Sequence, residues 1–468
     1  MKITLIEPGS PDWHVFSDFP LPRLGLPIIS AILKKDGHSV NIFCEDLAPI
    51  DYKIAYSSDL IGISTTTSTA PRAYKIAREF KEIGIPVVMG GPHATFRPEE
   101  ALTYSHYCVR GEGEETIKEL VIALSNGCEL SGIKGLSYIE DGQFKHNQPR
   151  ELLCDLDSLP FPDIDGIVGK ERLKIFPIQT SRGCPFNCKF CSVTPMFGKK
   201  YRMRSIDSVI EEIEYRKPRD IFFYDDNFTS DKERTKKMLE VIAKKGISPK
   251  NWTAQVRIDV ARDKELLRLA KATNCLFFYI GFESANPETL KEYKKGQTLD
   301  EIKEGIGIIH KFGIRIHGMF VLGSDSDRQE TTRETVDFAK KYKIDTVQFL
   351  ILTPLPGTKT FDELDKAGRI FTYNWELYDG MNVVYQPKQM TPYQLQLGNI
   401  KALRRFYSLR SVFKLILKFK FLNALLRYYG RRIRRKWEAK HKEALKKLKD
   451  FSAEILKKRG VKYEKNGF

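Results

Sequence analysis

Two stretches of the chain alternate short apolar segments with segments of helical spacing, a pattern that favours parallel sheets packed against helices. The candidate strands of the first stretch lie at 3–6, 40–43, 60–64, 86–89 and 107–110. Those of the second stretch lie at 177–180, 220–224, 252–257, 275–281, 315–320 and 347–352. We therefore expect an α/β protein with an N-terminal Rossmann-like domain followed by a partial (β/α)6 barrel.

The pattern divides the 468 residues into four expected parts. A sheet domain covers 1–135, a linker 136–175, the barrel 176–390 and a helical tail 391–468. The linker is expected because the stretch 155–167 is rich in turn-forming residues, including Pro160 and Pro162. The tail is expected to be helical because it carries helical spacing and lacks strand signals.

Positive charge is concentrated in the tail. Residues 401–468 hold 23 Lys and Arg against 5 Asp and Glu, a net charge of +18, whereas the rest of the chain is close to neutral. Apolar residues at 412, 415, 416, 419, 422 and 426 form one helical stripe beside a basic row. Such a helix either lies in a membrane interface or packs on the barrel, and both options stay open. A nucleic-acid partner is not expected, because the chain shows no recognisable RNA-binding module.

The N-terminal residues lack the basic-then-apolar layout of a signal peptide, and no apolar run approaches the roughly 20 residues that span a bilayer. We expect a cytoplasmic protein, with a peripheral position on the inner face of the membrane left open by the tail.

Three of the eight cysteines lie within eight positions, with C-x3-C-x2-C spacing. Cys184, Cys188 and Cys191 follow the first candidate strand of the second stretch, inside the segment TSRGCPFNCKFC. Three thiolates on one short loop can hold three irons of a [4Fe–4S] cluster and leave the fourth iron open. A zinc site and plain structural thiols are the alternatives, but a closed zinc site wants four ligands, usually as separated pairs.

This motif resembles that of the radical S-adenosylmethionine (SAM) superfamily, and the domain order is similar to its cobalamin-binding subclass, over roughly residues 1–400. The resemblance implies that Cys184, Cys188 and Cys191 ligate the cluster and that SAM chelates the open iron. It also implies that one electron, from a reductant such as flavodoxin or ferredoxin, splits SAM to give a 5′-deoxyadenosyl radical.

Polar residues at the ends of the second, third and fourth barrel strands are candidates for binding SAM. Asp225 or Asp226 could approach the amino group, and Arg257, which shares a strand face with Gln255, could pair with the carboxylate. Each also has an ordinary reading, as a turn residue or half of a structural salt bridge. The ribose candidates are Glu283 and Ser284, and His317 stands on the fifth strand near the expected adenine position.

Small and hydroxyl residues at three strand ends of the first stretch leave room for a bulky ligand. The resemblance makes that ligand cobalamin, and the candidates are Ser64, Thr65, Thr67, Gly90, Gly91, Gly111 and Glu112. Many cobalamin domains carry Asp-x-His-x-x-Gly, whose histidine ligates cobalt. Here Asp12 and His14 match, but Ser17 replaces the glycine, so we expect His14 to be a surface-loop residue.

The function that this resemblance implies is cobalamin-dependent methylation of an unactivated carbon, and the tail suggests a lipid-like or other hydrophobic small-molecule substrate. Three alternatives remain: a radical SAM cyclase or oxygen-inserting enzyme acting on a tetrapyrrole or other substrate, an RNA methylthiotransferase-like enzyme, and a non-enzymatic cobalamin or redox sensor.

Overall fold

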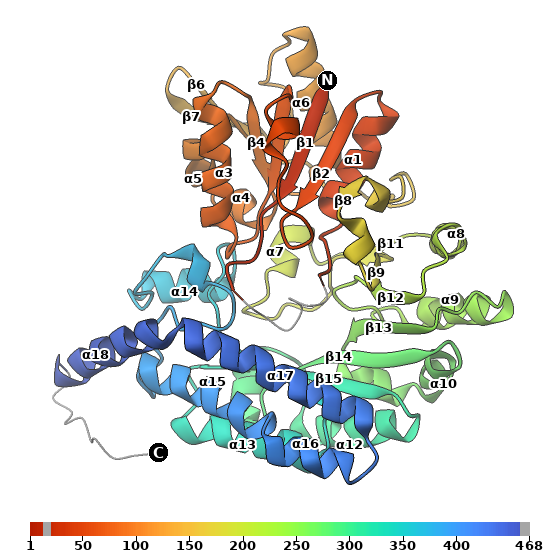
Figure 1. Ribbon diagram of the computed structural model, residues 1–468, viewed down its shortest axis with the longest axis vertical. Coiled ribbons are helices and arrows are strands. Elements are labelled where there is room, and N and C mark those ends of the chain that lie inside the picture. The colour runs from red at the N-terminus through yellow and green to blue at the C-terminus, as the bar shows by residue number, and fades with distance from the viewer. Residues whose placement is uncertain (13–19, 459–468) are drawn as a thin grey trace. The chain divides into compact units, whose positions relative to one another are not determined.

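The computed structural model describes residues 1–12 and 20–458 of the chain (Figure 1). They pack into two compact units, and each is described by itself. The first consists of residues 1–11, 20–186 and 192–254, and the second of Asp12, 187–191 and 255–458. Position 14, considered above as a cobalt ligand, lies outside the described residues.

The first unit contains an eight-stranded sheet in the order β7-β6-β5-β4-β3-β1-β2-β8. Neighbouring strands from β5 through β8 in this order pair parallel, and β6 and β7 add an antiparallel edge. The strands are β1 Lys2–Glu7, β2 Ser39–Cys44, β3 Leu60–Ser64, β4 Val87–Gly90, β5 Tyr107–Val109, β6 Leu136–Glu140, β7 Gln143–His146 and β8 Ile167–Val168.

The central strands of this sheet are apolar because helices cover them. β1 is buried at every position except its first, and Leu5 pairs with Ile42 on one side and Gly62 on the other. Buried strands of parallel sheets read as continuous apolar runs, which is why the sequence pattern predicted them. The helices are α1 Gly25–Lys35, α2 Tyr52–Ala55, α3 Ala70–Glu82, α4 Pro92–Phe96, α5 Pro98–Tyr104 and α6 Glu114–Asn126.

Strands β6, β7 and β8 come from the stretch 136–175, where the sequence showed no strands. β7 is exposed at three of its four positions, and β8 is only two residues long. Neither can carry the apolar pattern on which strand prediction depends.

A second sheet has six strands in the order β16-β15-β14-β13-β12-β9. The predicted α/β fold class with a partial barrel is confirmed, and each of the six strands lies within a few residues of its predicted position. They are β9 Phe176–Ile178, β12 Asp220–Phe223, β13 Asn251–Val256, β14 Cys275–Glu283, β15 Arg315–Leu322 and β16 Thr346–Ile351.

Helices connect these strands, and a two-stranded antiparallel hairpin follows β9. The hairpin pairs β10 Ser181–Arg182 with β11 Arg202–Met203. The short 3-10 helices are η1 Ile164–Gly166, η2 Lys170–Arg172, η3 Ile258–Arg262 and η4 Trp375–Leu377. The helices are α7 Val193–Phe197, α8 Ile206–Arg216, α9 Lys232–Lys244, α10 Lys264–Ala272, α11 Pro287–Glu292, α12 Leu299–Lys311, α13 Gln329–Lys341 and α14 Lys359–Lys366.

The C-terminal part of the second unit is helical, as predicted. Thr391 caps α15 through a capping box with Gln394, and Asn399 of this helix donates a hydrogen bond to the carbonyl of Phe349 in β16 at 2.8 Å. The four helices are α15 Pro392–Phe406, α16 Leu409–Ile416, α17 Phe421–Lys440 and α18 Lys442–Lys458. Among the described residues, no helix is both long and apolar enough to cross a bilayer.

Candidate active site

A cavity of about 360 Å³ opens at the carboxyl ends of β1, β3, β4 and β5, within the first unit. In an open parallel sheet this is the edge where ligands bind. Most of its wall is apolar, with side chains from β4, α1, α6 and α7. The apolar lining residues include Ile28, Ile29, Val88, Ile117, Val193, Met196 and Phe197.

Five of the seven residues predicted to bind cobalamin line this cavity, namely Ser64, Gly90, Gly91, Gly111 and Glu112. Thr65 and Thr67 are instead buried in the turn after β3, where Thr65 hydrogen-bonds Thr69 at 2.8 Å and Thr67 contacts the ring of His93 at 3.3 Å. The two threonines therefore shape the turn that forms the rim.

Gly91 is the residue of the rim that most requires glycine. Its φ is +89°, and a Cβ there would lie 2.6 Å from the carbonyl oxygen and 2.9 Å from the nitrogen of Thr65. Both the left-handed backbone and this close approach exclude a side chain. A rim made of glycine backbone lets a bulky ligand come close to the sheet edge, so the rim and the apolar wall are compatible with part of a cobalamin molecule.

The carboxylate of Glu112 is held by two arginines. Arg202 donates to both of its oxygens, at 2.7 and 2.8 Å, and Arg182 donates to one at 3.2 Å. Arg182 also pairs with Glu114 at 2.7 Å, and all four side chains are buried. Burial opposes ionisation of Glu112, but the hydrogen bond from Arg202 and the charges of both arginines outweigh it and lower its pKa. Glu112 lines the cavity, and its oxygens serve mainly to hold the arginines.

These arginines lie directly opposite each other in the β10–β11 hairpin. Two like charges facing across an antiparallel pair repel, so the hairpin needs a counter-charge between them. Glu112 supplies it from the end of β5. Because Arg182 is two residues before Cys184, this network fixes the start of the cysteine loop.

The three cysteines lie on the irregular segment between β10 and α7, and each is partly exposed. Gly183 has a φ of +87°, and a Cβ there would lie 2.6 Å from the carbonyl oxygen of Lys200. On the other side, Cys191 donates to the carbonyl of Cys188 at 3.2 Å, which closes a turn. Phe190 packs edge-on against Tyr293, with ring centres 4.9 Å apart.

Among the described residues, no group of three or more His, Cys, Asp and Glu side chains could hold a metal ion by converging on it. An iron–sulfur cluster needs a different arrangement from a single metal ion, because each cysteine thiolate binds a different iron atom. Three partly exposed thiols spread along one loop are the donor set that such a cluster takes.

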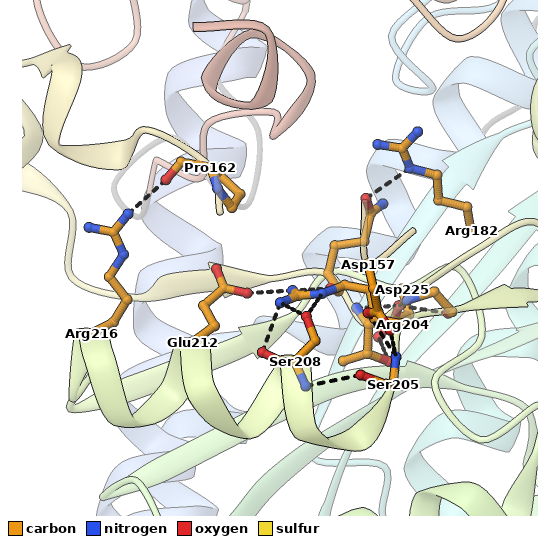
Figure 2. Close-up of polar contacts among 12 residues, drawn as sticks. Asp157, Pro162, Arg182, Arg204, Ser205, Ser208, Glu212, Arg216 and Asp225 are labelled. Atoms are coloured by element: carbon orange, nitrogen blue, oxygen red, sulfur yellow. Dashed lines mark hydrogen bonds and ion pairs between the residues drawn. The ribbon is translucent and has the colours of Figure 1, made fainter. Parts of the chain in front are cut away.

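Asp225, predicted to approach SAM, instead holds the strand that leads into the cysteine loop. Its carboxylate accepts bonds from the backbone N–H groups of Thr180 and Ser181 and from both hydroxyls, at 2.5 to 3.1 Å. Figure 2 shows Asp225 beside Arg204, which donates to the carbonyl of Gln179 at 3.0 Å and pairs with Glu212. The residues before the cysteines are therefore fixed by side chains from the segments after β12 and β11, and α8 holds Arg204 through Glu212.

Asp226, the neighbour of Asp225, lines the cavity. Its side chain is exposed there, and protein surrounds its carboxyl on the other sides. Burial raises its pKa to about 7, and the neighbouring charge of Asp225 adds to the shift. It is the member of the acidic pair that can meet a bound ligand.

The remaining SAM candidates lie in the second unit. Arg257 is buried and donates to the carbonyl of Lys295, and half-buried Gln255 precedes it on β13. Glu283, at a φ of +62°, pairs with the ammonium of Lys295 at 2.6 Å. The hydroxyl of Ser284 accepts a bond from Asn286 at 3.0 Å. Their assignment to SAM stays a prediction.

The histidine of the fifth strand is packed as a core residue. His317 is buried against Tyr279, its Nδ1 lies 2.8 Å from the hydroxyl of Thr346, and burial lowers its pKa to about 4. A neutral, enclosed imidazole is what a structural role requires.

Sequence reasoning missed several residues of the site. It did not single out Arg182 and Arg202, or Tyr224, or the apolar wall from α1 and α7. The only sequence signal for the arginines was that each stands beside the cysteine loop, and this signal does not show what they contact.

Comparison with known proteins gives a consistent result. Residues 178–339 match the model of the radical SAM superfamily, and residues 17–121 match that of the B12 binding domain. An uncharacterised methyltransferase of Pyrococcus horikoshii is 37% identical over 407 residues, which cover 82% of this chain and 88% of that protein. The bacteriochlorophyllide d C-12(1)-methyltransferase of Chlorobaculum tepidum is 29% identical, over 79% of this chain and 78% of its own.

Among solved structures, the radical SAM methyltransferase TsrM of Kitasatospora setae, with cobalamin and a [4Fe–4S] cluster bound, has a TM-score of 0.66. It is 20% identical and covers 78% of this chain and 75% of its own. At that identity the likeness concerns the fold.

Replacing Gly91 by alanine should weaken cobalamin binding at least about tenfold, equivalent to about 1.4 kcal/mol. The new methyl group would push against the backbone of Thr65 and displace the rim. The matched control is Gly84→Ala, where φ is +80° but nothing lies within 4 Å of the added Cβ. Cobalamin retained per chain, measured by absorbance after extraction, should fall only in the first variant. Equal retention would show that the rim does not hold the ligand.

Replacing Glu112 by glutamine should lower the free energy of unfolding by about 3 kcal/mol, because two buried arginines lose their shared counter-charge. The iron bound after anaerobic reconstitution should fall with it. Glu115→Gln, at an exposed position in the first turn of α6, should change stability by less than about 0.5 kcal/mol. Urea unfolding and iron analysis measure the two effects. A Glu112 variant as stable as the control contradicts the assignment.

Asp226 should make the cofactor-free protein less stable as pH rises from about 4 to about 7. In this window the folded protein holds a proton that the unfolded chain has released, since the pKa of this carboxyl is raised from 3.8 to about 7. Asp226→Asn should therefore lose less stability between pH 5 and pH 7.5 than the parent protein does. Urea midpoints measure the difference, with exposed Asp207→Asn as control. An unchanged pH dependence in Asp226→Asn would refute the raised pKa.

Proposed function

We propose, because this chain belongs to the cobalamin-binding radical SAM enzymes, that it transfers a methyl group to an unactivated carbon of a hydrophobic, lipid-like molecule. The observation that carries the proposed reaction is the presence, in one chain, of a three-cysteine loop and a glycine-rimmed cavity at a parallel sheet edge.

The enzyme uses a [4Fe–4S] cluster, SAM and cobalamin, and like other radical SAM enzymes it needs a reductant and a small-molecule substrate. Together, when bound, these cofactors supply one-electron cleavage of SAM, hydrogen abstraction from carbon and a transferable methyl group. The protein supplies the binding, the orientation and the dry surroundings.

The residues of the chain have separate roles in the proposed reaction. Cys184, Cys188 and Cys191 would each hold one iron. Asp225 fixes the strand before them through four hydrogen bonds, which would hold the start of the cysteine loop in place. The glycine rim would take cobalamin, and the apolar wall of the cavity keeps water from a reactive centre. The remaining assignments to SAM are proposed for Asp226, Gln255, Arg257, Glu283 and Ser284.

A relative supports a hydrophobic substrate, and the lipid-like character is proposed from the apolar stripe of the tail. The Chlorobaculum enzyme acts, by its name, on a bacteriochlorophyllide, a molecule with a large apolar ring system. The same relative favours a tetrapyrrole as the second candidate substrate, on which the machinery would methylate, close a ring or insert oxygen.

The test uses anaerobically reconstituted enzyme, a chemical reductant and SAM with a deuterated methyl group. It is incubated separately with a total lipid fraction and with a tetrapyrrole fraction. We expect 5′-deoxyadenosine together with one deuterated methyl group in a lipid. The variant with serine at 184, 188 and 191 should form neither product.

Mass spectrometry distinguishes the outcomes. Label in a tetrapyrrole would move the proposal to the second substrate. A product without the label would indicate ring closure or oxygen insertion. Formation of 5′-deoxyadenosine by the triple serine variant, at the rate of the parent enzyme, would refute the proposed cluster site.

A further inference from the structure

Helices α16 and α17 form a hairpin in the second unit (Figure 1). Apolar side chains of this hairpin are exposed to solvent. The exposed fractions of these side chains run from 40% to 83%, the highest being those of Leu417 and Phe419 in the turn. We call this surface the hairpin face. It consists of Leu409, Phe413, Ile416, Leu417, Phe419, Phe421, Leu422, Leu425 and Tyr428.

The spacing groups most of these side chains on one face of each helix, and the two helices pack against each other. On α16, residues 409, 413 and 416 are four and three positions apart, and on α17 residues 421, 425 and 428 repeat that spacing. Such spacing puts the side chains on one face of each helix. Single exposed apolar residues are normal, but a contiguous patch built from two helices marks a binding surface.

The inward face of α17 is polar, which is the reverse of an ordinary surface helix. Asn423 donates to the carboxylate of Asp345 at 2.7 Å. Arg427 donates to the carbonyls of Ile344 at 3.1 Å and Phe406 at 3.0 Å, and its guanidinium lies over the Phe406 ring, 3.6 Å from the ring centre. These buried contacts fix the rotation of the helix, so the apolar face is held toward solvent.

The charged side chains of the hairpin as far as Trp437 are all of one sign. Residues 380–437 contain no aspartate or glutamate, and the turn itself reads Lys418-Phe419-Lys420. Arg410 and Lys414 on α16 and Arg432 and Arg435 on α17 are also exposed. A second copy of this chain would bring the same cations against one another, whereas an anionic lipid surface would neutralise them.

We infer that the hairpin face docks on a bilayer that contains anionic lipid. The apolar side chains enter the interface between headgroups and acyl chains while the flanking cations contact lipid phosphates and carboxylates. The helices lie on the membrane, and the buried contacts of Asn423 and Arg427 keep them on the protein. This inference concerns a surface outside the catalytic machinery and does not depend on the proposed reaction.

The test is sedimentation of the full-length holoenzyme with vesicles. We expect binding to phosphatidylcholine vesicles that contain 30% phosphatidylserine, on the order of tenfold weaker binding to pure phosphatidylcholine, and weaker binding as salt rises. The triple variant Leu417→Ser, Phe419→Ser and Phe421→Ser should bind at least about tenfold more weakly. All three side chains are at least 60% exposed, so the thermal unfolding midpoint should be unchanged.

A matched control removes exposed apolar groups elsewhere. Ile83→Ser with Tyr215→Ser takes away side chains that are 56% and 67% exposed in the first unit, and it should bind vesicles like the parent. Replacing Lys414, Lys418 and Lys420 by glutamine should remove the preference for phosphatidylserine.

Two results would overturn the inference. One is equal vesicle binding by the serine triple and the Ile83/Tyr215 control. The other is a dimer in solution that the serine triple converts to a monomer, which would make the hairpin face a contact between copies of the chain.

Discussion

The geometry of the cysteine loop depends on one buried carboxylate, that of Glu112, placed between Arg182 and Arg202. The two arginines face each other across a pair of two-residue antiparallel strands, and without a counter-charge their repulsion would separate the strands. A buried ion pair adds little net stability compared with apolar packing, but removing one member leaves unpaired charge in the interior. The network therefore acts mainly by specifying one conformation of the loop base.

A loop that binds a cluster needs this external support because it has little structure of its own. Between β10 and α7 the backbone is irregular, and fixing each residue costs about 1–2 kcal/mol of conformational entropy. Helix and sheet hydrogen bonds offset that cost elsewhere. Here the offset comes from side chains, with Asp225 holding Thr180 and Ser181 ahead of the loop and α7 following it. Buried carboxylates perform at the loop base the task that a sheet ladder performs in a strand.

The fold was predictable because the buried positions of a strand or helix require apolar residues, and these leave a recognisable pattern in the sequence. Strands covered on both faces must be apolar throughout, and glycine must stand where the rim turns at Gly91. The site was predictable only in part. Glu112 and Asp225 stand at strand ends, as the sequence indicated, but their partners approach from 41 to 90 positions away in the chain. The position of a residue at a strand end does not show whether its side chain contacts a ligand. The side chain can instead support the loop that binds the ligand.

The tail shows a second limit of prediction from sequence, which concerns the orientation of a helix. The spacing of apolar residues predicts one stripe at 412, 415, 416, 419, 422 and 426, yet within it Val412 is buried whereas Phe419 is the most exposed. A hydrophobic stripe predicts a helix but not which way the helix is turned. That rotation is set by Asn423 and Arg427, whose hydrogen bonds to Asp345, Ile344 and Phe406 would be lost if the apolar side turned inward. Buried polar groups of α17 that need hydrogen-bond partners thus decide the orientation of the helix. The apolar side chains that this orientation leaves in water are the ones that need a binding partner.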